Sequence, residues 1–234
     1  MDKIIIYSPQ DVRDRSDILK YYIEKNNLKI AAQNEEEKEQ LIRNVAETTN
    51  YFSVVDLIYL LEKADDISRE RGKDAIDKSD FTEAYLQVTT GRVSTRARAE
   101  HDNELVAKHE CGHALALQVM YDIAKKEEKP WHLPDTVDFI TLDPRGDYGG
   151  AVYHKDSETK QRSYDKVFSS LVTNFGGHAS EKRFYNMDGS WGITQDMAMA
   201  THMAKLAVQK MGMGPKTGRI SVERNQLGMS VISE

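Results

Sequence analysis

The first third of the chain carries apolar residues at helical spacing. Apolar positions recur every three or four residues across 18–23, 41–45, 54–64 and 81–88, which gives each segment one apolar face. Ser79 precedes the last stripe as a possible N-cap, with Glu83 in the first turn, and Gly91 is a natural end for that helix. The pattern therefore predicts a helical bundle before residue 91.

The pattern changes between residues 91 and 100. No apolar period is present there, and Arg92, Arg96 and Arg98 alternate with small residues. A charged segment of this kind is usually solvated, so we expect a basic connector and a domain junction. The predicted domains are residues 1–95 and 96–234.

Beyond the junction, periods of about 3.6 and of 2 alternate along the chain. The elements they predict are a strongly apolar helix over 101–122, strands over 137–142 and 149–153 that form a hairpin, and helices over 165–185 and 194–211. No clear periodicity follows Gly214. The expected fold class is mainly α, with a mostly helical second domain that holds a small β-sheet.

Charge and cysteine usage narrow the function classes. The 234 residues include 32 basic and 38 acidic side chains, a net charge of −6, which argues against a nucleic-acid binder that relies on a basic field. The single cysteine, Cys111, cannot form an intramolecular disulfide, and no run of about 18 apolar residues is present. We therefore expect a cytoplasmic chain.

The sequence His-Glu-Cys-Gly-His at residues 109–113 is the main candidate for chemistry. On a helix, His109 and His113 lie one turn apart on one face, so both imidazoles can reach one Zn²⁺ ion. Glu110 lies beside them, where its carboxylate can take a proton from the attacking water. Cys111 is expected to point into the packing behind the site, and Gly112 is expected where another segment approaches closely. The alternative is a buried helix with two hydrogen-bonded histidines.

A catalytic zinc site usually takes three protein ligands, so a third must come from downstream. The residues alone leave Glu181 and Asp196 open. An Asp in the first turn of a helix is also common without any metal, because it meets the positive end of the helix dipole, and Thr194 is a possible cap there.

Four segments in order resemble the peptidase domain of the FtsH family of membrane-anchored, ATP-dependent zinc proteases. They are the histidine motif with Ala114, Pro-Arg-Gly at 144–146, Gly-Gly-His-Ala-Ser-Glu at 176–181, and Thr-Gln-Asp followed by Ala-Thr within 194–201. The resemblance implies that Asp196 is the third zinc ligand and that Glu181 supports the site from behind the ligands. Glu181 as a direct ligand stays an alternative.

The first domain is similar to the helical lid of an AAA+ ATPase. The similar segments are 11–20, Phe-Ser-Val-Val-Asp-Leu at 52–57, and Asp80 with Phe81. Val54 and Val55 replace the Gly-Ala of the family, and no Gly-x-x-x-x-Gly-Lys-Ser/Thr loop is present, so ATP is expected only in a longer parent protein. His178 and Gln195 also depart from the family pattern, and we expect the two long C-terminal helices of the family to be missing after Gly214.

The resemblance further implies a zinc-dependent endopeptidase acting on unfolded or membrane proteins. It implies a hexameric homo-oligomer and a parent anchored in a membrane with this part on the cytoplasmic side. Gly149, Gly150, Ala151 and Val152 are the candidate edge strand for extended substrate, although an ordinary hairpin strand would look the same. The other function class is a non-catalytic helical assembly or adaptor module that keeps the zinc-protease scaffold.

Overall fold

The computed structural model describes residues 9, 11–94, 98–129, 132–146, 148–155, 163–190, 192–224 and 230–233. This part of the chain contains eight α-helices and two two-stranded antiparallel sheets, which confirms the mainly α fold class. The chain forms two compact units, one of residues 1–95 with 144–147 and the other of residues 96–143 with 148–234.

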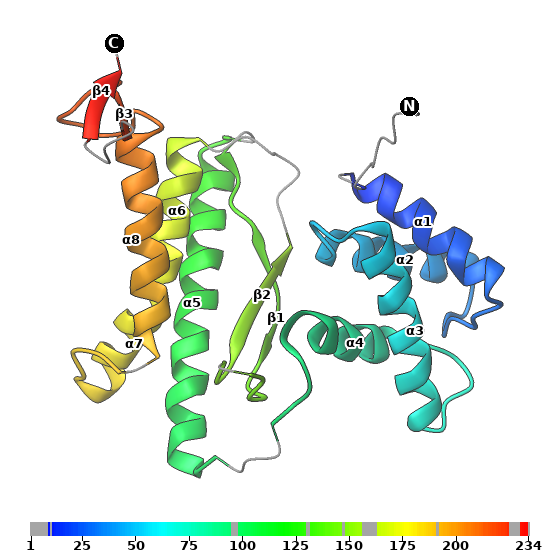
Figure 1. Cartoon of the computed structure of the whole chain (residues 1–234). Helices are drawn as coiled ribbons and strands as arrows, with labels where there is room; N and C mark the ends of the chain where they lie inside the picture. Colours follow the sequence, from blue (N-terminus) through cyan, green and yellow to red (C-terminus); the bar gives the residue numbers. More distant parts are fainter. Residues whose placement is uncertain are drawn as a thin grey trace. The chain divides into compact units, whose positions relative to one another are not determined.

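The N-terminal unit is a bundle of four helices with well-formed N-termini. The helices are α1 (Val12–Lys25), α2 (Glu35–Thr48), α3 (Val54–Glu70) and α4 (Lys78–Thr90) (Figure 1). Ser53 and Asp56 form a capping box at α3. At α4 the box is formed by Asp77 and Asp80, so the expectation that Ser79 is the cap is wrong, because the chain enters the helix two residues earlier.

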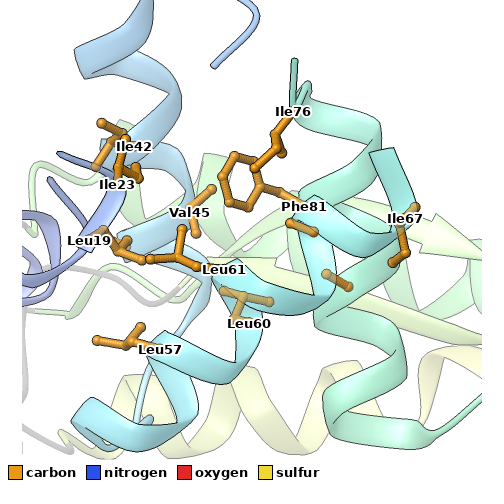
Figure 2. Close-up of a cluster of buried hydrophobic side chains, with 13 residues drawn as sticks. Leu19, Ile23, Ile42, Val45, Leu57, Leu60, Leu61, Ile67, Ile76 and Phe81 are labelled. Carbon is orange, nitrogen blue, oxygen red and sulfur yellow. The ribbon is translucent and has the colours of Figure 1, made fainter. Parts of the chain in front are cut away.

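Apolar side chains from all four helices fill the centre of this unit. Leu57, Leu60 and Ala64 of α3 are completely buried, as is Ala84 of α4. Figure 2 shows Leu61 of α3 close to Leu19 of α1 and Val45 of α2. Burial of a leucine or isoleucine side chain contributes about 1.5–3 kcal/mol, so this cluster is the main source of stability here.

A short segment from far along the chain completes the N-terminal unit. Arg145 is almost fully buried, and its guanidinium donates to Glu83 Oε2 at 2.7 Å and to the Gly91 carbonyl at 2.9 Å. The Ser94 amide donates to the Pro144 carbonyl at 2.7 Å. The predicted turn between the two strands of the second domain is therefore held inside the first unit.

The C-terminal unit is organised around one long helix. Its elements are α5 (Glu100–Lys126), β1 (Thr136–Thr141), β2 (Ala151–Lys155), α6 (Tyr164–Asn174), α7 (Gly176–Tyr185), α8 (Ile193–Gln209), β3 (Ser221–Arg224) and β4 (Ser230–Ser233). Figure 1 shows the β1–β2 hairpin running beside α5. The strands pair antiparallel, with Ile140 opposite Val152 and an irregularity between Val137 and Phe139.

Three details of this unit differ from the sequence-based expectations. The helix expected over 165–185 is two helices, because the chain changes direction at Phe175. Helix α8 begins after Gly192 without a side-chain cap, so Thr194 does not cap it. The region after Gly214, which lacks a clear period, contains the β3–β4 hairpin.

Helices α5 and α7 cross at a pair of glycines. A Cβ added at Gly112 would lie 2.3 Å from the Gly176 carbonyl oxygen, and one at Gly176 would lie 2.4 Å from the Gly112 carbonyl oxygen. Neither position can hold a larger residue unless the helices move apart. The expected close approach at Gly112 is confirmed. Among the described helices, none is both long and apolar enough to cross a membrane.

Candidate metal centre

The structure brings together three side chains from two helices. His109 and His113 project from one face of α5, and Asp196 comes from the first turn of α8. The two Nε2 atoms lie 3.0 Å apart, and Asp196 Oδ2 lies 3.2 Å from each of them. These three donor atoms form a nearly equilateral triangle.

The hydrogen bonds behind the imidazoles assign their tautomers. His113 Nδ1 lies 2.7 Å from the Thr173 carbonyl oxygen, which can only accept, so this nitrogen carries the proton. The Gly177 amide is more distant, at 3.3 Å from the same nitrogen. His109 Nδ1 lies 2.7 Å from Glu181 Oε1. In the neutral imidazoles both Nε2 lone pairs therefore face Asp196.

The triangle is suited to a cation. Asp196 Oδ2 is buried and receives no hydrogen bond of ordinary geometry from the described residues, although both Nε2 atoms are close. Three electron pairs at this separation repel one another unless a proton or a metal lies between them. A tetrahedral zinc ion with ligands at about 2.0–2.1 Å sets its donor atoms roughly 3.3 Å apart. The residues present fit zinc.

The electrostatics of the group agree with that reading. Burial lowers the pKa of His109, but the Asp196 and Glu181 carboxylates favour the protonated ring and raise it above the usual value. Burial also lowers the pKa of His113, and Asp196 with the Thr173 carbonyl again outweighs it. Burial raises the pKa of Asp196, but both imidazoles lower it to about 2. The site attracts positive charge.

Glu110 lies next to this triangle on α5. It is buried, and its burial raises the pKa of its carboxyl group, which the nearby histidines oppose. A Cβ added at Gly150 would lie 3.0 Å from Glu110 Cγ. The segment that enters β2 therefore passes against the side chain of Glu110, and a glycine permits the contact.

Glu181 of α7 is also buried, and it contacts His109 from the opposite side of the ring to Asp196. Its Oε1 atom accepts from His109 Nδ1 and from Ser190 Oγ, both at 2.7 Å. The carboxylate is thus directed at the back of the imidazole. Of the two alternatives for a third ligand, this geometry favours Asp196.

Several contacts at the site had no clear signal in the sequence. A Cβ added at Gly177 would lie 2.4–2.6 Å from atoms of both imidazoles, so the glycine pair makes room for the rings. Arg98 is not a solvated connector residue, because it donates to the Gly149 and Leu142 carbonyls. Backbone acceptors cannot be read from residue types, which explains the wrong expectation for Arg98. Arg96 lies outside the described residues.

Cys111 is exposed, so the expectation that it packs behind the site is wrong. Two residues along a helix correspond to a rotation of about 200°, which turns Cys111 away from the imidazole of His109. The described residues leave the cysteine exposed on that face of α5. His178 lies on α7, and one of its ring nitrogens, Nδ1, is buried without a hydrogen-bond partner among the described residues.

Comparison with known proteins now decides the family. The model of Peptidase family M41 matches residues 96–233, more than half of the chain and all of the elements that form the site. The chain belongs to peptidase family M41. The predicted membership of the FtsH family of proteases is thereby confirmed.

Individual relatives of this M41 chain agree. It is 31% identical to an ATP-dependent zinc metalloprotease FtsH of Aquifex aeolicus, over 95% of this chain and 33% of the relative. It is 29% identical to an FtsH of Streptobacillus moniliformis, over 100% of this chain and 31% of the relative. It is 26% identical to the mitochondrial inner membrane m-AAA protease component AFG3L2 of Mus musculus, over 100% of this chain and 27% of the relative. The chain spans about a third of these relatives' length.

Proposed function

We propose that this M41 chain is a zinc-dependent endopeptidase in which His109, His113 and Asp196 hold the metal and Glu110 is the catalytic base. One observation carries the proposal. The Nε2 atoms of His109 and His113 and a carboxylate oxygen of Asp196 face one another, while each Nδ1 atom already has a hydrogen-bond acceptor. A buried pair of hydrogen-bonded histidines would direct a proton between its members. In the neutral tautomers inferred from the Nδ1 partners, neither ring has a proton on Nε2 to share with the other.

The metal, Glu110 and Glu181 would each have a separate role in peptide hydrolysis. Zinc, when bound, supplies a Lewis acid that polarises the scissile carbonyl and acidifies a water molecule. Glu110 takes the proton of the attacking water and delivers it to the leaving amine nitrogen. Its raised pKa suits both roles, because a carboxyl group with a pKa nearer to neutrality returns a proton more readily. Glu181 holds the ring of His109 through Nδ1.

The start of β2 is the proposed place for substrate. Gly149 and Gly150 precede the strand, and Ala151 and Val152 begin it. In the described residues, β2 pairs only with β1, and the Gly150 backbone lies against Glu110. An extended substrate paired here would be bound by its backbone with little preference for sequence, as the degradation of unfolded protein chains requires.

The larger context is proposed from the relatives. Their printed names describe ATP-dependent proteases and, for AFG3L2, the mitochondrial inner membrane. We accordingly infer that the chain is the proteolytic part of an ATP-dependent, membrane-associated protease, with residues 1–95 as the AAA+ lid and with homo-oligomeric, hexameric assembly. ATP would be bound by a longer parent, and the cytoplasmic side is the proposed location.

Metal analysis with cleavage of unfolded casein tests the proposal. One zinc per chain is expected, with cleavage that a chelator abolishes and zinc restores. Glu110→Gln should lower cleavage by about 10²–10⁴-fold and retain the zinc, because only the proton carrier is lost. A chain that binds no zinc after reconstitution would support the alternative, a non-catalytic assembly module.

A further inference from the structure

Ser190 lies in the connection between α7 and α8, where no sequence motif placed a functional residue. Its hydroxyl donates to Glu181 Oε1 at 2.7 Å. The Ser190 Oγ atom also accepts from the Gly192 amide at 3.1 Å. One side chain therefore joins the carboxylate behind His109 to the residue at which α8 begins.

This link connects the two sides of the metal centre. Glu181 orients His109 on α5, whereas α8 carries Asp196 in its first turn. Because α8 has no side-chain cap, the Ser190–Gly192 contact is the side-chain hydrogen bond that holds the backbone at its start in the described residues. The position of Asp196 relative to His109 thus depends on Ser190.

The surroundings make the contact costly to lose. Glu181 is about 1% exposed, and its second oxygen, Oε2, has no hydrogen-bond partner in the described part of the chain. Oε1 is therefore the oxygen through which the described residues stabilise this carboxylate, and Ser190 supplies one of its two donors. A buried carboxylate that loses a donor is poorly compensated and no longer fixed in direction.

We infer that Ser190 is a positioning residue for the zinc site, acting through Glu181 on His109 and through Gly192 on Asp196. The inference rests on the proposed function for its metal. It concerns neither a ligand nor a catalytic group. Ser190 sets the separation between two ligands that come from different helices.

Zinc affinity, measured by competition with a chromophoric chelator, is the first test. Ser190→Ala should weaken zinc binding by about 10–100-fold, the usual effect of removing a residue that orients a ligand, and Ser190→Thr should restore most of it because the hydroxyl is kept. Ser163→Ala is the matched control. That serine caps α6 by accepting from the Lys166 amide at 3.2 Å, so its loss should leave zinc affinity unchanged.

Two further measurements separate this inference from the proposed function. Glu181→Gln should make the Ser190→Ala effect smaller, whereas independent effects would contradict action through Glu181. In the metal-free chain, Ser190→Ala should speed hydrogen exchange of the Gly192 amide and of the His109 Nδ1 proton. Unchanged exchange and unchanged zinc affinity would overturn the inference. Altered exchange in a chain that binds no zinc would uphold the link and overturn the proposed metal site.

Discussion

The two compact units both bury ionisable side chains, but they surround them differently. The N-terminal unit has a conventional core in which leucine, isoleucine and alanine side chains are almost fully covered. In the C-terminal unit the long helix α5 turns His109, Glu110 and His113 inward, and Glu181 is more completely buried than any apolar residue described there. The first unit also buries Arg15, Asp80 and Arg145, but each of them has ion-pair or hydrogen-bond partners of opposite character within that unit. In the second unit, the lone pairs of His109, His113 and Asp196 converge on one another instead.

From this difference we predict that zinc stabilises the second unit. Burying ionisable groups is unfavourable unless they are paired or bind a metal. In the metal-free site, three lone pairs converge beside a buried carboxylate. A bound zinc ion would compensate them all at once, and its binding free energy would add to the folding free energy of this unit alone.

Removal of zinc is expected to have the largest effect. Chelation should destabilise the C-terminal unit by several kcal/mol, because a metal that binds only the folded chain adds its binding free energy to folding, and should leave the N-terminal unit folded. His113→Ala should have the same result without a chelator. Hydrogen exchange resolved by residue measures both units in one experiment. If chelation reduced the protection from hydrogen exchange equally in α3 and α5, zinc would not act on the C-terminal unit alone.

A cavity in the apolar core should have the reverse effect. Leu60→Ala removes a completely buried side chain from α3 and should cost about 2–5 kcal/mol of unfolding free energy in the N-terminal unit. Zinc affinity should not change, because His109, His113 and Asp196 belong to the other unit. Thermal unfolding and chelator competition on the same variant check both parts.

Crowding of the imidazoles gives a third test. Gly177→Ala places a methyl group where both rings lie, so we expect a cost of about 1–3 kcal/mol and weaker zinc binding, although alanine favours helices. Gly72→Ala is the comparison. Its positive φ of 70° makes alanine strained, but nothing lies within 4 Å, so it should destabilise the first unit and spare zinc. Equal zinc affinity in the two variants would refute the crowding argument.

The smallest expected effect is a pH dependence of the metal-free chain. The pKa values of His109 and His113 are raised in the fold, so the protonated rings beside Asp196 stabilise it below about pH 6.5, and this is lost as the pH rises through the raised values. Asp196, with a pKa of about 2, stays ionised throughout. The free energy of unfolding should fall by on the order of 1 kcal/mol between pH 6 and pH 8, which a lower melting temperature would report. Saturating zinc should abolish this fall. Greater stability at pH 8 without metal would contradict it.

Much of the site follows from local geometry. His109 and His113 meet because four residues make slightly more than one helical turn, and Glu110 lies beside them for the same reason. The glycine at 112 indicated a crossing partner, which is α7. The third candidate ligand does not follow from local geometry. Spacing left Glu181 and Asp196 open, and the resemblance to a family selected Asp196.

The sequence by itself determined the helical elements, the paired histidines and the family motifs, because helix period and motif spacing act over a few residues. Only the tertiary structure decided which carboxylate faces the Nε2 atoms, that Ser190 joins Glu181 to α8, and that Arg145 lies inside the first unit. These contacts join residues from different elements, and several of them use backbone atoms. Such atoms are the same in every residue, so the chain must fold before they have distinct partners.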